Sequence, residues 1–289
     1  MTPDPIVDAH QHVWDLSARD QPWLADAALA PIRRSFALTE LEPEAASTKV
    51  TSTVLVQTIA VADETPEFLA LAAASRLVAG VVGWVDLTAP DIAETIGALR
   101  ELPGGEHLVG IRHPVQDEPD PHWLIRPDVI RGLAAVASAG LAYDLLVQSH
   151  QIPAAARAAA TLPELTFVLD HLGKPPIAAG ERAPWAGDIK TLAALPNTVC
   201  KLSGLVTEAD WRTWSLRDLR PFAETALEEF GPDRLMFGSD WPVCLLAASY
   251  RDVVDTAATL TGSLSPTEQA TVFAGTATRV YGLLPRGER

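Results

Sequence analysis

The sequence predicts a single-domain α/β fold, a (β/α)8 TIM barrel, on three observations. Short apolar runs alternate with Ala/Leu-rich stretches along nearly all of the 289 residues. Most of the eight runs are continuous in hydrophobicity, as in parallel strands that are buried on both faces. The segment after the first run lacks the Gly-rich phosphate turn that would favour the competing fold, a doubly wound open sheet. We therefore expect one barrel over residues 1–289.

The predicted strands and helices alternate along the chain, and several of the helices begin near a proline, which a first helical turn tolerates. The strands are expected at Ile6–Ala9, Thr53–Gln57, Val78–Val85, Leu108–Arg112, Ala142–Val147, Thr166–Leu169, Thr198–Leu202 and Leu235–Phe237. The helices are expected at Pro66–Arg76, Pro90–Arg100, Asp128–Ala139, Pro153–Ala160, Ala186–Ala194, Leu219–Phe230, Tyr250–Leu260 and Pro266–Tyr281. The segment Trp14–Glu40 is long for a strand-to-helix loop and is expected to cover or shape a site.

Composition excludes several classes of function. The net charge of −15 leaves no basic surplus for nucleic acid or for a membrane surface, although a small anionic ligand stays possible. The two cysteines, Cys200 and Cys244, form neither a disulfide framework nor a CxxC motif. No signal peptide or membrane-spanning run is evident. We expect a soluble, cytoplasmic protein with a small-molecule partner; the oligomeric state is not predicted.

Polar side chains gather directly after the predicted strands. In a parallel barrel these carboxyl ends open on one face, where the active sites of such folds lie. Five of the seven histidines are at such positions. The residues concerned are His10, His12, Gln57, Trp84, Asp86, Arg112, His113, Gln148, His150, Asp170, His171, Lys201, Ser203, Ser239, Asp240 and Trp241.

Four of these residues predict a water-activating site. His10 and His12 are two apart on an extended segment, so both imidazoles point to the same side and could chelate a divalent cation. A bare HxH is also typical of a hydrogen-bonded pair, and Asp8 before it could orient the pair or cap the strand. Taken alone, His171 and Asp240 are each also typical of a strand end or a turn with a purely structural role. Their convergence at one barrel face favours catalysis.

Several local stretches resemble the amidohydrolase superfamily, and more specifically its sugar-lactonase branch, which includes L-fuconolactonases and L-rhamnonolactonases. The resemblance runs in order along essentially the whole chain. Its segments are Val7-Asp8-Ala9-His10-Gln11-His12-Val13-Trp14-Asp15, Val168-Leu169-Asp170-His171-Leu172-Gly173-Lys174-Pro175, Lys201-Leu202-Ser203-Gly204 and Phe237-Gly238-Ser239-Asp240-Trp241-Pro242. The resemblance implies a hydrolase of carboxylic esters that opens a small sugar lactone in carbohydrate metabolism.

One departure from the superfamily bears on the metal. Binuclear members carry a carboxylated lysine after strand four, whereas this sequence has Gly110-Ile111-Arg112-His113-Pro114 there. A guanidinium cannot form that carbamate. We therefore expect one divalent metal ion, zinc first among the candidates, held by His10, His12, Asp240 and His171. A metal-independent mechanism is the alternative, since the branch includes such lactonases.

The chemistry of lactone hydrolysis predicts roles for the polar residues. Asp240, His171, His10 and His12 are the expected catalytic residues, with Asp240 as the base that takes the proton of the attacking water. The expected substrate-binding residues are Arg112, His113, His150, Lys174, Trp14, Trp84 and Trp241. Arg112 is equally compatible with a structural salt bridge, Lys174 with a loop-setting role, and each tryptophan with packing. Ser203 and Ser239 lack the GxSxG elbow of serine esterases.

Three other functions stay open on the sequence. Hydrolysis of a pyrone dicarboxylate or muconolactone would need several cationic side chains in the pocket. A metal-dependent decarboxylase of the same superfamily would release carbon dioxide from an unsaturated or aromatic acid. A non-catalytic binding barrel would have no need of the four-residue set.

Overall fold

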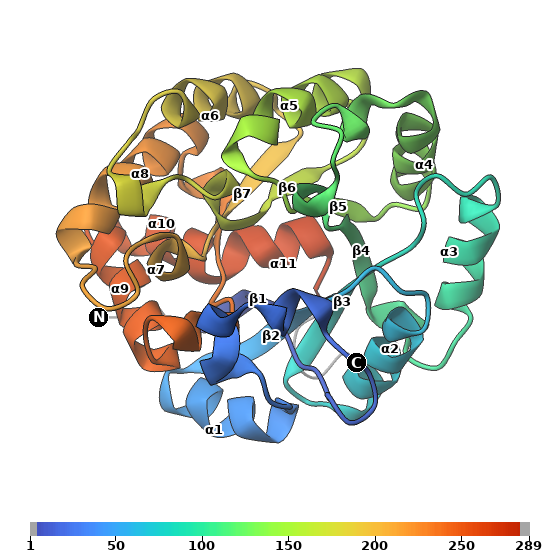
Figure 1. The fold of residues 1–289 in the computed structure, drawn as a ribbon, viewed down its shortest axis with the longest axis horizontal. Helices are drawn as coiled ribbons and strands as arrows, with labels where there is room; N and C mark the ends of the chain where they lie inside the picture. Colours follow the sequence, from blue (N-terminus) through green and yellow to red (C-terminus); the bar gives the residue numbers. More distant parts are fainter. Residues whose placement is uncertain (1–4, 284–289) are drawn as a thin grey trace.

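The computed structural model describes residues 5–283 and contains all eight predicted strands (Figure 1). Each strand pairs in parallel with the next one along the chain, from β1 to β8. The strands are β1 Ile6–Gln11, β2 Val50–Val56, β3 Val78–Gly83, β4 Leu108–His113, β5 Ala142–Leu145, β6 Phe167–Leu169, β7 Thr198–Leu202 and β8 Leu235–Phe237. The predicted (β/α)8 barrel is confirmed.

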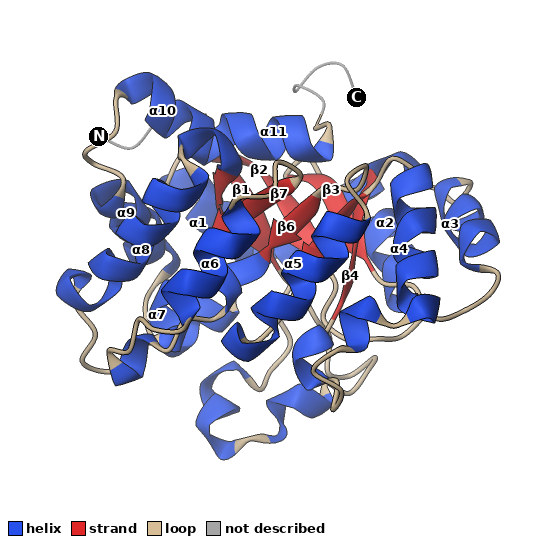
Figure 2. Ribbon diagram, turned by 90° about the horizontal axis from the view of Figure 1, so that it is seen from above, coloured by secondary structure: helices blue, strands red, loops and turns tan. Residues whose placement is uncertain are grey.

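Helices follow each strand and surround the barrel (Figures 1 and 2). A π-helical turn, Thr271–Gly275, joins the last two helices into the C-terminal run that the sequence predicts. The helices are α1 Leu38–Ser47, α2 Glu64–Ala74, α3 Ile92–Arg100, α4 Pro127–Ser138, α5 Ile152–Thr161, α6 Trp185–Ala193, α7 Leu205–Glu208, α8 Leu216–Phe230, α9 Tyr250–Leu260, α10 Pro266–Ala270 and α11 Thr276–Tyr281. None of them, within residues 5–283, is long and apolar enough to cross a lipid bilayer.

Two helices differ from the sequence expectation. Helix α1 begins inside the segment that is expected to be a loop, which otherwise contains two 3-10 turns at Pro22–Ala25 and Ala27–Ile32. The sequence does not predict α1 because Pro43 lies inside it, and an interior proline ordinarily breaks a helix. The short helix α7 has only four residues, too few to show a helical period.

The barrel closes between β8 and β1, and this seam carries the site. Backbone hydrogen bonds run from Asp240 N to the His10 carbonyl (2.8 Å) and from His12 N to the Trp241 carbonyl (2.7 Å). The buried Asp8 carboxylate accepts hydrogen bonds from Ser239 N (2.8 Å) and Oγ (2.6 Å). Asp8 is thus core-facing, and it fixes the two segments on which His10 and Asp240 lie.

The two ends of the barrel are built differently. Small apolar residues of the strands fill the interior, and Ala277 and Tyr281 of α11 pack into the same cluster. Figure 2 shows α11 against one end of the strands and the long connecting loops at the opposite end. The C-terminal helix therefore closes the amino end of the barrel and leaves the carboxyl end open for a site.

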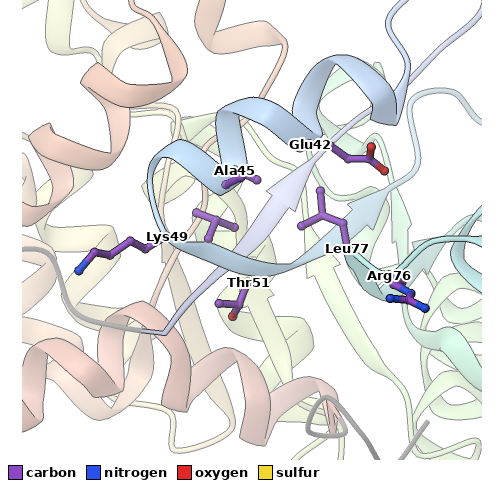
Figure 3. A pocket seen from close by; sticks show the side chains of 8 residues that line it. Glu42, Ala45, Lys49, Thr51, Arg76 and Leu77 are labelled. Atoms are coloured by element: carbon purple, nitrogen blue, oxygen red, sulfur yellow. The ribbon is translucent and has the colours of Figure 1, made fainter.

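A small hollow of about 420 Å³ lies beside α1 and the start of β2 (Figure 3). Its floor is largely aliphatic, from residues such as Ala45 and Leu77. Figure 3 shows Lys49 and Arg76 at its two ends, directed away from each other. Because its charged side chains do not converge, we do not regard this hollow as the functional site.

Candidate active site

A cavity of about 1100 Å³ opens at the carboxyl ends of the strands. Its inner end contains His12, Arg112, His171 and Asp240, all of which are buried. Its mouth is formed by segments that follow the strands, chiefly the loops after β1, β2, β4 and β7. The residues that line it there are Arg19, Asp20, Pro22, Trp23, Leu29, Thr58, Ile59, Ala60, Val61, Asp63, His113, Pro114, Gln116, Asp117, Glu118, Leu146, Lys174, Thr207, Glu208, Trp211, Val243 and Leu246.

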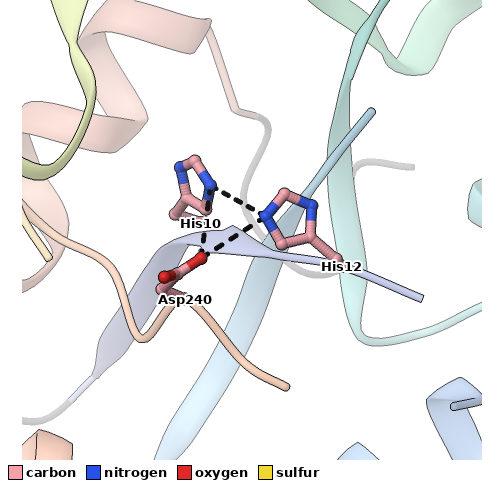
Figure 4. A group of neighbouring side chains, drawn as sticks. All are labelled: His10, His12 and Asp240. Carbon is pink, nitrogen blue, oxygen red and sulfur yellow. Dashed lines mark hydrogen bonds and ion pairs between the residues drawn. The ribbon is translucent and has the colours of Figure 1, made fainter. Parts of the chain in front are cut away.

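The four residues expected to act on water do meet at the inner end; Figure 4 shows His10, His12 and Asp240 facing one another. Asp240 Oδ1 is 3.4 Å from His12 Nε2, 3.8 Å from His10 Nε2 and 3.9 Å from His171 Nε2. His10 Nε2 and His12 Nε2 are 3.0 Å apart. These residues lie at or just after the carboxyl ends of β1, β6 and β8, so residues up to 230 positions apart share one small volume.

The backbone is strained where these side chains leave their strands. Asp240 has a φ of 59°, a left-handed conformation that costs a residue with a side chain roughly 1–2 kcal/mol. His171, Leu172, Gly173 and Lys174 form a complete left-handed turn, with φ values of 52°, 55°, 68° and 52°. The turn presents its first and last residues to the cavity, since both His171 and Lys174 line it. Strain concentrated at a cavity is typical of functional sites.

Neighbouring residues hold the left-handed turn in place. Trp185 Nε1 donates to the Leu172 carbonyl at 2.8 Å, and His171 Nδ1 lies 2.8 Å from Ser203 Oγ. Gly204 packs directly on the imidazole, because a Cβ built there would come within 2.7 Å of His171 Cβ. Trp185 is therefore a buried support of the turn.

A layer of buried charges lies under the four residues. Arg112 Nη1 donates to Asp170 Oδ2 at 2.9 Å, and its Nε and Nη2 donate to Gln57 Oε1 at 3.0 and 2.8 Å. Lys201 Nζ lies 2.5 Å from Asp144 Oδ2 and 3.0 Å from Asp170 Oδ1. All of these groups are at most 3% exposed. The charges compensate one another, which is what burial of ions requires.

The pKa shifts favour the forms needed for water activation. Burial lowers the pKa of His171 to about 4 and that of His10 well below its ordinary value. Burial alone would raise the pKa of Asp240, but the surrounding imidazoles, His171 foremost, lower it well below its usual range. At neutral pH the imidazoles of His10 and His171 are therefore neutral beside an ionised Asp240 carboxylate.

The donor atoms also fit a divalent metal ion. Ligands on a tetrahedral zinc, with bonds of about 2.0–2.2 Å, lie roughly 3.4 Å apart. The separations among His10, His12 and Asp240 bracket that value, and His171 Nε2 lies 3.9 Å from Asp240 Oδ1. His12 Nδ1 donates to the Val56 carbonyl (2.8 Å), which leaves its Nε2 lone pair facing the site. The set of neutral imidazoles and one carboxylate is the type that binds zinc and similar ions.

Three of the seven residues expected to bind substrate line the cavity, and four do not. Arg112, His113 and Lys174 line the cavity. His113 is fixed by Trp84 Nε1, which donates to its Nδ1 at 3.0 Å, and by Glu118 Oε1 at 2.8 Å from its Nε2. Four expected residues are not part of the cavity lining within residues 5–283: the exposed His150, the half-buried Trp84 and the buried Trp14 and Trp241.

The structure also places residues in and under the site that sequence reasoning did not single out. Trp23, Trp211 and Glu208 line the mouth, and Asp144 and Tyr281 belong to the layer below. For Asp144 a signal exists, because a charged residue inside an apolar strand demands a buried partner. For Tyr281, on a helix far from the strand ends, the sequence carries no such signal.

Comparison with known proteins identifies the family of the chain. The family model described as Amidohydrolase matches residues 7–283. An L-fucono-1,5-lactonase from Burkholderia multivorans is 41% identical, with 96% of each chain covered, and one from Burkholderia ambifaria is 38% identical, with 98% of each covered. A crystal structure of an amidohydrolase from Burkholderia multivorans with bound zinc superposes with a TM-score of 0.92 at 40% identity, covering 97% of this chain and all of that one. The chain belongs to the amidohydrolase family.

Proposed function

We propose that the protein hydrolyses a neutral sugar lactone of the L-fucono-1,5-lactone type to the open hydroxy acid. The observation that carries the proposal is the inner end of the cavity, where an ionised Asp240 is surrounded by His10, His12 and His171. The names of the two Burkholderia relatives support the choice of a sugar lactone.

In the proposed mechanism, water attacks the ring carbonyl carbon and Asp240 accepts its proton. The same carboxyl then returns the proton to the ring oxygen as the C–O bond breaks, so that the product is the hydroxy acid. The imidazoles of His10 and His171 orient water and polarise the carbonyl. His10, His12, Asp240 and His171 would hold a metal ion, which when bound lowers the pKa of water and polarises the carbonyl.

The charge of the mouth supports a neutral substrate over a polyacid. The cavity lining has six carboxylates and three cations, and each cation already faces a carboxylate. Arg112 pairs with Asp170, Arg19 with Glu67 (2.7 Å), and Lys174 lies 3.9 Å from Glu208. A pyrone dicarboxylate or a similar polyanion would meet net repulsion here. Sugar hydroxyls, in contrast, both donate to carboxylates and accept from Lys174.

The test is acid release from purified protein, followed with a pH indicator. The panel contains L-fucono-, L-rhamnono- and galactono-lactones, with a dicarboxylated lactone as the comparison, each run with and without a chelator. We expect a neutral lactone to be the best substrate by kcat/KM. Faster turnover of the dicarboxylated lactone would favour the polyacid alternative. No acid release from any lactone, with zinc or manganese added, would contradict the proposal.

A further inference from the structure

An imidazole and a carboxylate that follow one another closely after β4 form a fixed pair at the mouth of the cavity. His113, the last residue of β4, and Glu118 both line the cavity. His113 Nε2 lies 2.8 Å from Glu118 Oε1, and Trp84 Nε1 donates to His113 Nδ1 at 3.0 Å. The proposed mechanism gives neither His113 nor Glu118 a step in the reaction, so another role has to explain the pair.

The two partners of His113 determine which of its nitrogens carries the proton. An indole N–H only donates, so His113 Nδ1 accepts from Trp84. A carboxylate oxygen only accepts, so the ring N–H lies on Nε2 and is donated to Glu118. Burial lowers the pKa of His113, which favours the neutral ring that these contacts require. His113 is therefore a fixed donor to one oxygen of Glu118.

The surroundings hold the pair in place. The imidazole stacks on the buried indole of Trp123, with ring centroids 4.3 Å apart and an interplanar angle of 12°. The turn between His113 and the carboxylate is anchored to the segment after β5. Gln116 N donates to the Leu146 carbonyl at 3.0 Å, and a glutamine amide of that segment donates to the carbonyl of residue 115 at 2.9 Å. The fold thus sets the position of the carboxylate.

The carboxylate of Glu118 has capacity for a further donor. Its side chain is 27% exposed, against 12% for that of His113, so it is the more open member of the pair. The imidazole N–H contacts Oε1, and a carboxylate accepts several hydrogen bonds on its two oxygens. Because the neutral His113 does not cancel the negative charge, a hydroxyl of a ligand in the cavity can donate to Glu118 without displacing the imidazole.

The arrangement of the strands indicates which part of a lactone would reach Glu118. With the barrel closed between β8 and β1, β4 lies across it from β8, which Asp240 follows. A lactone whose carbonyl lies beside Asp240 at the inner end extends its far edge toward the mouth. In a 1,5-lactone, C3 and C4 are farther from the carbonyl than C2. The hydroxyl that reaches Glu118 is therefore on C3 or C4.

We propose that Glu118 is a specificity-determining residue that accepts a hydrogen bond from the C3 or C4 hydroxyl of the lactone, and that His113 is the positioning residue that holds it. The inference rests on the proposed function, because it takes the substrate to be a neutral lactone with hydroxyls on its ring. It deepens that function by naming the edge of the ring that the protein recognises.

The test compares L-fucono-1,5-lactone with its 2-, 3- and 4-deoxy analogues on wild-type protein and on Glu118→Gln. A hydrogen bond to a charged acceptor corresponds to a factor of about 10 to 100, so the wild type should discriminate by that factor in kcat/KM against the 3- or the 4-deoxy analogue. The variant amide keeps an oxygen for the His113 N–H but has an NH₂ in place of the second accepting oxygen. This discrimination should therefore fall by about tenfold in Glu118→Gln, mainly through KM, while discrimination against the 2-deoxy analogue stays the same.

Asp117→Asn is the matched control. Asp117 is the adjacent residue, lines the same cavity and is exposed, so its amide removes the same charge from the same wall. It should shift kcat/KM of all four lactones alike and keep the wild-type discrimination. Trp84→Phe keeps an aromatic ring but lacks the N–H that orients His113, so it should reduce the discrimination in the same direction by less. The melting temperature of each variant controls for folding.

The outcomes separate recognition from a merely structural pair. Wild-type discrimination in Glu118→Gln, or an equal loss of it in Asp117→Asn, would overturn the inference. Wild-type discrimination in Trp84→Phe would remove the positioning role of His113.

A second measurement keeps this inference distinct from the proposed function. L-fucose and its 3- and 4-deoxy forms have no lactone bond to open, and calorimetric titration gives their Kd values. If no lactone is opened, the proposed function fails and these Kd values decide the inference. We expect one deoxy form to bind the wild type about tenfold more weakly than L-fucose, and Glu118→Gln to bind both alike. Equal Kd values on the wild type, or no binding of any of these sugars, would overturn the inference.

Discussion

The inner end and the mouth of the same cavity differ in how their polar groups are paired. At the inner end, Arg112, Asp170 and Lys201 make contacts of 2.9–3.0 Å and are at most 3% exposed. At the mouth, Lys174 is 3.9 Å from Glu208, and their side chains are 20% and 26% exposed. Buried polar groups held in fixed positions are suited to stabilising the charge that develops in a reaction. Partly exposed side chains on loops are suited to selecting a ligand. The comparison assigns the chemistry to the inner end and specificity to the mouth.

The largest expected effect is at the inner end, from Asp240→Asn. An amide keeps the size of the side chain but cannot take a proton from water, so kcat should fall by roughly 10²- to 10⁴-fold. The rate of lactone opening measures it, and the melting temperature serves as the control for folding. A variant that keeps more than a tenth of wild-type activity would remove Asp240 as the base.

A slightly smaller effect is expected from Gly204→Ala, which touches the site only through His171. The added methyl would lie 2.7 Å from His171 Cβ, at a φ of 67°. We expect about 1–3 kcal/mol of lost stability, together with a loss of kcat. Urea unfolding and initial rates measure the two. Gly180→Ala is the matched control, because Gly180 has a similar φ of 68° and no atom within 4 Å of a built Cβ. Equal activities of the two variants would contradict the role of the contact.

The pH dependence of kcat/KM and of the free energy of unfolding should reflect the lowered pKa of the buried His171. Its pKa is lowered from 6.5 to about 4, so kcat/KM should fall as the pH drops through about 4. The unfolded chain takes up this proton near pH 6.5, so the stabilising contribution is fully present above pH 6.5 and is lost as the pH falls toward 4. Initial rates and urea unfolding over this range separate the two effects. An acid limb near 6.5 would mean that His171 titrates as an exposed imidazole.

The smallest effect is expected at the mouth, from Trp211→Ala. Trp211 is half-buried and lines the cavity. Loss of an aromatic contact of roughly 1 kcal/mol should raise KM by about fivefold and leave kcat nearly unchanged. Trp214→Ala is the matched control, because Trp214 is also half-buried but is not among the cavity residues. Similar kinetics for both variants would mean that Trp211 does not contact the substrate.

The sequence predicts the strands and the convergence of His10, His12, His171 and Asp240 well for a physical reason. Buried parallel strands are continuous apolar runs, and closing them into a barrel forces the residues that follow them onto one face. Once the alternation is recognised, the approximate place of each residue after a strand is determined. Helix α1 is missed because its interior Pro43 contradicts the local rule, which tertiary packing overrides.

The substrate side of the site is predicted less well. Which residues line a cavity depends on loop conformation, and the left-handed turn from His171 to Lys174 has no sequence pattern that specifies it. Trp14 follows a strand like the other site residues but packs against Phe36 and Trp23 instead. Tyr281 reaches Asp144 from the opposite end of the barrel, a contact that only the complete fold reveals.

The most direct test of this division compares two residues at the ends of one turn, His171 and Lys174. His171→Asn should lower kcat by roughly 10²-fold or more with little change in KM, because it alters the reacting end. Lys174→Met should raise KM severalfold with kcat nearly unchanged, because it removes a contact made equally before and during the reaction. Steady-state kinetics on the best lactone provide both values. A fall in kcat of the same size in both variants would contradict the separation of chemistry from recognition.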